Sequence, residues 1–176
     1  YINSYMKIAI LGSGGREHAL TFSISKSNKV KKIYCIPGNA GTSSLAENIS
    51  IDINNFETVY EFLKKNNIDF VVVGPEDPLV NGIVDYLEKL NINVFGPNKV
   101  ASQLEGSKIF TKNLCKKYNI PTAEFGVFKN AEESYNYIDN AKHPLVIKAD
   151  NLAAGKGVYI CREKKESYLA VKEIFD

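Results

Sequence analysis

Two glycine-rich segments of the sequence have the composition of loops that bind phosphate groups. The first, Gly12-Ser13-Gly14-Gly15, follows a short apolar run and leads directly into Arg16, Glu17 and His18. The backbone amides of such a turn and the amino end of a following helix attract anions, and the planar guanidinium of arginine suits a phosphate group. This segment therefore predicts a site for a small phosphorylated ligand.

The second segment has a lysine near each end and small residues between them: Lys148-Ala149-Asp150-Asn151-Leu152-Ala153-Ala154-Gly155-Lys156-Gly157. Small side chains allow a backbone to approach phosphate oxygens closely. It is not a Walker A loop, because Asp150 stands where that motif has its first glycine and Gly157 replaces the Ser or Thr that contacts magnesium. The segment predicts a different phosphate-binding loop, with a plain hairpin carrying solvated lysines as the alternative.

The first turn does not fit a dinucleotide-binding motif. GxGxxG counted from Gly12 requires a glycine where Glu17 stands, and the second predicted strand ends at Ile36-Pro37 without an acidic residue for a ribose hydroxyl. An NAD-dependent dehydrogenase is thereby disfavoured. On this segment alone, glycines that only form a tight turn remain an open alternative.

Strands and helices are predicted to alternate around the first segment, with Ala19, Leu20 and Ile24 on the inner face of the first helix. This alternation predicts a doubly wound α/β fold with a parallel sheet. In such sheets ligands bind at the carboxyl ends of the strands. The predicted strands are 7–11, 30–36, 69–73 and 93–95, the helices are 17–27, 56–66 and 79–90, and the loops expected at one rim are 12–16, 37–41, 74–78 and 96–97.

Beyond Asn98 the pattern changes and predicts a second unit. Ser107 is expected to cap a helix, and Lys108 lies in its first turn, where a cation opposes the helix dipole and is either tolerated or useful. The predicted domains are residues 6–104 and 105–176. The second unit's predicted helices are 107–118, 131–140 and from 164 onward, and its predicted strands are 145–149 and 157–161.

The composition disfavours several classes of partner. The 22 basic and 20 acidic residues are interspersed and give a net charge of +2, so no nucleic acid partner is expected. The apolar runs are strand-sized and the first residues lack a signal segment, so we expect no membrane partner and a cytoplasmic protein. Cys35, Cys115 and Cys161 are widely spaced, which predicts reduced packing thiols.

Five segments together, in this order and spacing, closely resemble the phosphoribosylamine–glycine ligase family, also called glycinamide ribonucleotide synthetases. The resemblance covers residues 6–176 and implies a Rossmann-like pre-ATP-grasp domain followed by the beginning of an ATP-grasp domain. The segments that carry it are Gly12-Ser13-Gly14-Gly15-Arg16-Glu17-His18-Ala19, Pro37-Gly38-Asn39-Ala40-Gly41-Thr42, Val73-Gly74-Pro75-Glu76, Gln103-Leu104-Glu105-Gly106-Ser107-Lys108, and Ile147-Lys148-Ala149-Asp150 with Leu152-Ala153-Ala154-Gly155-Lys156-Gly157-Val158.

The resemblance also implies a reaction and a set of site residues. ATP would phosphorylate glycine to glycyl phosphate, and the amine of 5-phosphoribosylamine would attack it, giving glycinamide ribonucleotide, ADP and phosphate in purine biosynthesis. Lys108 and Lys148 would be catalytic. The phosphoribosylamine residues would be Gly14, Gly15, Arg16, Glu17, His18, Pro37, Gly38, Asn39, Ala40, Gly41, Gly74, Pro75 and Glu76, and the ATP residues Lys108, Lys148, Asp150, Ala153, Ala154, Gly155, Lys156 and Gly157.

The Mg²⁺ or Mn²⁺ ligands implied by the resemblance would lie beyond residue 176, so the 176-residue chain is expected to be inactive by itself. A monomer is also expected. The sequence departs from the family at Asn151, where the phosphate loop normally has glycine; asparagine tolerates positive φ best after glycine. Two alternatives stay open. One is another ATP-grasp ligase with a similar front domain, such as a formate-dependent or carboxylase relative, and the other is a non-catalytic module that binds a nucleotide or phosphosugar.

Overall fold

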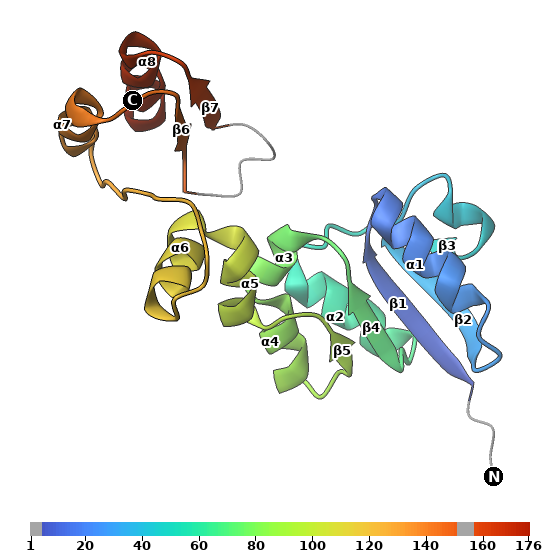
Figure 1. Cartoon of the computed structure of the whole chain (residues 1–176). Coiled ribbons are helices and arrows are strands. Elements are labelled where there is room, and N and C mark those ends of the chain that lie inside the picture. Colours follow the sequence, from blue (N-terminus) through green and yellow to red (C-terminus); the bar gives the residue numbers. More distant parts are fainter. Residues whose placement is uncertain (1–4, 151–156) are drawn as a thin grey trace. The chain divides into compact units, whose positions relative to one another are not determined.

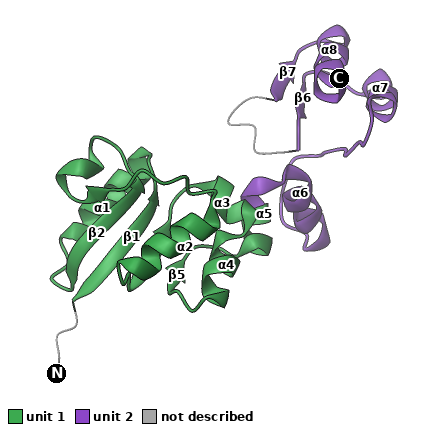
Figure 2. Cartoon of the chain, turned by 180° about the vertical axis from the view of Figure 1, so that it is seen from behind, with its two compact units in different colours: residues 1–103 green, residues 104–176 purple. Residues whose placement is uncertain are grey.

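A computed structural model describes residues 5–150 and 157–176. The chain divides into two compact units, Tyr1–Gln103 and Leu104–Asp176 (Figure 2). Each unit has its own secondary structure, as Figure 1 shows. Among the described residues, no helix combines the length and apolar character that crossing a membrane requires.

The first unit is built on a five-stranded parallel sheet in the order β3-β2-β1-β4-β5. Alternating residues of the central strand face opposite sides, as the pleat requires. Ala9 and Leu11 point into a core with α2 and α4, whereas Ile8 and Ile10 point into a core with α1. The strands are β1 (Met6–Gly12), β2 (Val30–Pro37), β3 (Glu47–Asn48), β4 (Phe70–Val73) and β5 (Val94–Phe95).

Helices cover both faces of this sheet, which confirms the predicted doubly wound α/β fold. The α2 helix buries Val59 and Leu63 at helical spacing, and its N-cap is Asn55, whose side chain accepts a hydrogen bond from the Thr58 amide. The helices of this unit are α1 (Gly15–Ser25), η1 (Thr42–Ser44), α2 (Phe56–Lys65), α3 (Glu76–Asn81), α4 (Ile83–Lys89) and α5 (Lys99–Gly106), of which the last ends within the second unit.

Two predictions about the helices of the first unit are wrong. The single helix predicted over 79–90 is two helices, because Gly82 has φ +97 and ends α3 in the left-handed conformation that glycine adopts without steric cost. Ala19 is exposed, and the most buried positions of α1 are Glu17 and Thr21. The sequence reasoning also did not predict β3 or α5.

The second unit contains the antiparallel pair β6 (Leu145–Lys148) and β7 (Val158–Cys161), with Leu145 opposite Cys161. The helices α7 and α8 pack together through the parallel rings of Tyr135 and Tyr168, whose centres are 4.6 Å apart. The unit's helices are α6 (Lys108–Lys117), α7 (Ala131–Asn140) and α8 (Lys164–Phe175).

The three cysteines are free thiols, as predicted. Cys35 and Cys161 are buried and Cys115 is half-buried. Burial raises the pKa of the Cys35 thiol, and the hydroxyls of Thr21 and Thr42 partly oppose that change. Cys35 therefore behaves as a packing residue between β2 and α1.

Candidate functional site

The ends of three neighbouring strands bring the predicted substrate loops to one rim of the sheet. Gly12, the last residue of β1, pairs with Pro37, the last residue of β2, and its carbonyl oxygen accepts a hydrogen bond of 3.1 Å from the Gly38 amide. On the other side of β1, the Gly74 amide donates to the Leu11 carbonyl oxygen at 3.0 Å. The first glycine turn, residues 37–41 and residues 74–76 therefore lie next to each other.

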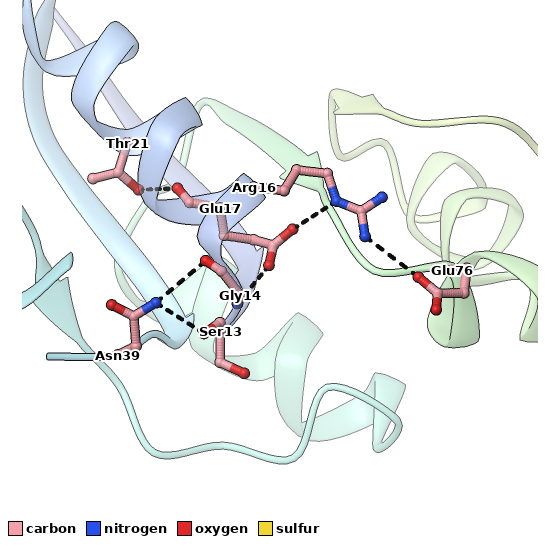
Figure 3. Close-up of polar contacts among 7 residues, drawn as sticks. All are labelled: Ser13, Gly14, Arg16, Glu17, Thr21, Asn39 and Glu76. Atoms are coloured by element: carbon pink, nitrogen blue, oxygen red, sulfur yellow. Dashed lines mark hydrogen bonds and ion pairs between the residues drawn. The ribbon is translucent and has the colours of Figure 1, made fainter. Parts of the chain in front are cut away.

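The side chain of Asn39 connects two of these loops. Its Nδ2 donates to the carbonyl oxygens of Ser13 at 2.8 Å and Gly14 at 3.2 Å (Figure 3). Its Oδ1 accepts hydrogen bonds from the amides of Gly41 at 2.8 Å and Thr42 at 3.0 Å. Both ends of the Asn39 amide are thus bonded to backbone, and the side chain fixes the 37–41 loop against the glycine turn.

Glu17 lies beneath the glycine turn with only 3% of its surface exposed. Its Oε2 accepts a 2.7 Å hydrogen bond from the Gly14 amide, so this amide of the predicted anion site is already used within the protein. A Cβ at Gly12 would lie 2.6 Å from the Cγ of Glu17, and a Cβ at Gly74 would overlap Oε1. Two of the glycines at the rim are therefore required by the space that the Glu17 side chain fills.

Arg16 is the charged group at the exposed side of this rim. Its Nε lies 3.2 Å from Oε1 of Glu17, and one terminal nitrogen donates to Oε2 of Glu76 at 3.3 Å (Figure 3). Glu76 is the first residue of α3, directly after the Gly74-Pro75 turn. The guanidinium thus bridges the loops that follow β1 and β4.

His18 and Gly41 are in close contact across the same rim. A Cβ at Gly41 would come within 2.6 Å of the imidazole ring of His18. Gly41 therefore gives the half-buried ring its room, while Ala40 is exposed at the turn of the loop. Each predicted substrate residue lies at this rim, but Asn39 and Glu17 direct their polar atoms mainly into the protein itself.

In the second unit, Asp150 caps helix α6 across a long sequence separation. The Ser107 hydroxyl lies 3.1 and 3.0 Å from its two carboxylate oxygens, and the Ile109 amide donates to Oδ1 at 3.0 Å. Ser107 is also the predicted N-cap, because its hydroxyl accepts from the Phe110 amide at 3.0 Å. A carboxylate at this helix end is stabilised by the dipole and joins the end of β6 to α6.

Two of the three predicted ATP lysines, Lys108 and Lys148, lie among the residues of this unit that the structure describes. Lys108 is the first residue of α6, and Lys148 is the exposed last residue of β6. The Ala149 amide bonds to the Gly157 carbonyl oxygen at 2.8 Å and extends the β6–β7 pairing by one step. The predicted ATP contacts Ala153, Ala154, Gly155 and Lys156, together with Asn151, lie outside the described residues.

A metal site is not present among the residues that the structure describes, which contain no group of three or more His, Cys, Asp or Glu side chains able to hold an ion. Sequence reasoning did not predict the Asn39 or Asp150 contacts. The Asn39 contacts had a local signal, because Asn followed three residues later by Thr is typical of a turn closed by side-chain hydrogen bonds. The partners of Asp150 lie 41 and 43 residues away, so no local signal exists for them.

The comparisons with known proteins agree in both units. Residues 6–105 match the family model described as phosphoribosylglycinamide synthetase, N domain, and residues 106–176 match phosphoribosylglycinamide synthetase, ATP-grasp (A) domain. The ADP complex of an N5-carboxyaminoimidazole ribonucleotide synthetase shares the fold, with a TM-score of 0.72 over 95% of this chain and 44% of that chain at 20% identity. The family-model match over residues 106–176 places the second unit in the ATP-grasp class.

Relatives with higher sequence identity than the N5-carboxyaminoimidazole ribonucleotide synthetase identify the family of the chain. The phosphoribosylamine–glycine ligase of Clostridium acetobutylicum is 50% identical over 167 residues, which are 95% of this chain and 40% of that protein. The crystal structure of phosphoribosylamine–glycine ligase from Thermotoga maritima has a TM-score of 0.73 at 36% identity and covers 93% of this chain and 38% of that one. The chain belongs to the phosphoribosylglycinamide synthetase family, which confirms the resemblance seen in its motifs. It spans about 40% of the length of the curated relatives it matches.

Proposed function

We propose that the protein containing this chain ligates glycine to 5-phosphoribosylamine with ATP. Glycine is first phosphorylated to glycyl phosphate, and the amine of phosphoribosylamine then displaces the phosphate, giving glycinamide ribonucleotide, ADP and phosphate in purine biosynthesis. The observation that carries this proposal is the match of 95% of the chain, at 50% identity, to a phosphoribosylamine–glycine ligase. The other ATP-grasp reactions considered above have weaker support, because the carboxyaminoimidazole relative is only 20% identical.

The rim of the first unit is assigned to phosphoribosylamine. Its exposed Arg16 offers a planar cation for the phosphate, and Glu76 offers an acceptor for the amine or a ribose hydroxyl. The ordered loops around them fix the substrate in one orientation, which is a large part of catalysis when separate substrates must be aligned. The assigned residues are 14–18, 37–41 and 74–76.

The second unit is assigned to the ATP phosphates. Lys108 and Lys148 would neutralise charge on the transferring phosphoryl group, and Asp150 and Gly157 flank the segment between β6 and β7. No protein nucleophile is needed, because the acyl phosphate is attacked by the substrate amine. Residues 153–156 share this proposed role. The Mg²⁺ or Mn²⁺ expected with ATP would help to neutralise the phosphate charge; the described residues contain no group of three or more His, Cys, Asp or Glu side chains that could hold it.

The domain assignment belongs to the same proposal. Residues 6–104 would form the substrate-binding domain and residues 105–176 part of the ATP-grasp domain. The division of the chain at Gln103 and the family-model boundary after residue 105 support this assignment. We further propose a cytoplasmic monomer.

The test combines an intact mass with a coupled assay for glycine-dependent release of ADP in the presence of phosphoribosylamine. Lys148→Met is expected to lower kcat at least about tenfold, since a charge-assisted contact to the phosphoryl group is lost. Lys142→Met, a substitution of another exposed lysine in the same unit, is the matched control and should leave kcat unchanged. A protein of the relatives' length that releases no ADP in response to glycine would overturn the proposal.

A further inference from the structure

Arg16 is held by two carboxylates that differ in burial and in freedom to move. Glu17 is 3% exposed, whereas the side chains of Arg16 and Glu76 are 57% and 41% exposed. Figure 3 shows the guanidinium lying between them. In the proposed function, on which this inference rests, Arg16 faces the phosphate of the ligand.

Glu17 cannot leave its place without disturbing the rim. The Gly14 amide donates a 2.7 Å hydrogen bond to Oε2 of the Glu17 carboxylate. The backbone at Gly12 and Gly74 approaches the side chain so closely that neither position has room for a Cβ. The carboxylate is therefore a fixed feature of the folded unit.

One oxygen of this fixed carboxylate lacks a hydrogen bond. Oε1 of Glu17 is buried and accepts no hydrogen bond from the described residues. The Nε of Arg16 is 3.2 Å away, which is an ion-pair distance, but its N–H does not point at the oxygen. A buried unsatisfied oxygen costs free energy, so a small rotation of the guanidinium that completes this bond would be favourable.

The hydrogen bond from Arg16 to Glu76 competes with that rotation, because it holds a terminal nitrogen of the same planar group. Glu76 is 41% exposed, and its Oε2 accepts a 3.3 Å hydrogen bond from a terminal nitrogen of the guanidinium. The three groups carry one positive and two negative charges, so the cluster as a whole does not attract an anion. A phosphate gains from Arg16 only when one carboxylate moves away, and the exposed one is able to do so.

We propose that Glu17 is a positioning residue that holds Arg16 from the buried side, and that Glu76 is an exchangeable partner whose place on the guanidinium is taken by the ligand's phosphate. Arginine has five N–H donors; one terminal N–H donates to Glu76, and Nε lies 3.2 Å from Oε1 of Glu17. When Glu76 leaves, four donors remain for the phosphate and for solvent. Glu17 then receives Nε–H and sets the direction of the terminal edge.

The test measures binding of ribose 5-phosphate to the 176-residue chain by calorimetry. This probe carries the phosphate but no amine, so any contact between Glu76 and the amine is absent from the readout. Glu17→Gln should weaken binding about tenfold, because the charge-assisted hold on Arg16 is lost. Glu76→Gln should strengthen binding between about 1.4- and 5-fold, the range expected when an exposed ion pair no longer competes.

The opposite signs of these two identical chemical changes at one arginine are the distinguishing result. Glu57→Gln, an exposed glutamate in the first turn of α2, is the matched control and should leave the dissociation constant unchanged. Shifts of the same sign for Glu17→Gln and Glu76→Gln, or no shift for Glu17→Gln, would overturn the inference. So would an active ligase whose parent chain fails to bind ribose 5-phosphate, whereas an absent ligase activity refutes the proposed function instead.

A second measurement covers the case in which Glu17→Gln does not fold. In the parent chain, the Nε–H signal of Arg16 in NMR spectra should shift and exchange more slowly with water when ribose 5-phosphate is added, because the bond to Oε1 is then complete. A signal that does not respond at saturating ribose 5-phosphate would contradict the positioning role. This readout is independent of any variant.

Discussion

Asn39→Ala should destabilise the first unit, because the Asn39 side chain connects two loops that are distant in sequence. The substitution removes four hydrogen bonds: two that Nδ2 donates to carbonyl oxygens of the glycine turn and two that Oδ1 accepts from amides of the following loop. The truncated group is a polar carboxamide, so the change acts mainly through these hydrogen bonds. The experiment therefore isolates the polar connection between the loops that follow β1 and β2.

The magnitude follows from the burial of the four bonds. The two accepted by Oδ1 are partly buried and should each contribute about 1 kcal/mol, and the two donated by Nδ2 are exposed and should contribute about 0.5 kcal/mol each. Asn39→Ala should therefore lower the free energy of unfolding of the first unit by about 3 kcal/mol. Asn39→Asp keeps the acceptor but places a carboxylate against two carbonyl oxygens, so it should lower this free energy as well.

The assay must resolve the two compact units, because Asn39 and its four bonds lie in the first one. Urea unfolding followed by the intensities of backbone amide signals in NMR spectra gives a midpoint for each unit, and the sequence has no Trp for a fluorescence readout. Asn54→Ala, at an exposed position in the same unit, is the control and should stay within about 0.5 kcal/mol of the parent. An Asn39→Ala change no larger than this control would refute the reasoning.

Three further predictions concern packing, pH and thiol reactivity. Gly74→Ala should destabilise the first unit by about 1–3 kcal/mol in the same urea experiment, because the added methyl overlaps the buried carboxylate, whereas Gly15→Ala, with open space around it, should not. In the second unit, the Lys164 ammonium hydrogen-bonds Asp139 and, with a neighbouring tyrosine hydroxyl, lowers the pKa of that carboxyl below its unfolded value. The stabilisation that Asp139 contributes is therefore present above about pH 4, its unfolded pKa, and is lost as the pH falls through its folded pKa. The free energies of unfolding of the parent and of Asp139→Asn should converge in acid. A constant difference between them down to pH 2 would contradict this prediction. In thiol titration with a disulfide reagent at pH 8, Cys35 should react only on unfolding, since burial raises its pKa and blocks access, and rapid modification of folded Cys35 would show that the β2 face is open.

The sequence was sufficient for features that are encoded over a few residues. The alternation of apolar runs and helical periodicity predicted the parallel α/β sheet, because side-chain spacing reflects which face of each element is buried. The prediction of one helix over 79–90 was wrong because the same periodicity continues across Gly82, where the helix is interrupted. A single glycine costs a helix only about 1 kcal/mol, so periodicity alone does not reveal that Gly82 adopts φ +97 and separates α3 from α4.

The sequence by itself determined the parallel α/β architecture of the first unit and the family, since the one rests on local spacing and the other on motifs read in order. Only the tertiary structure decided what those residues touch. It showed that Glu17 is buried beneath three glycines, that Asn39 bonds to a turn 25 and 26 residues away, and that Asp150 caps a helix more than 40 residues earlier. Such contacts depend on how distant segments pack, and no periodicity along the chain records which polar atoms will meet there.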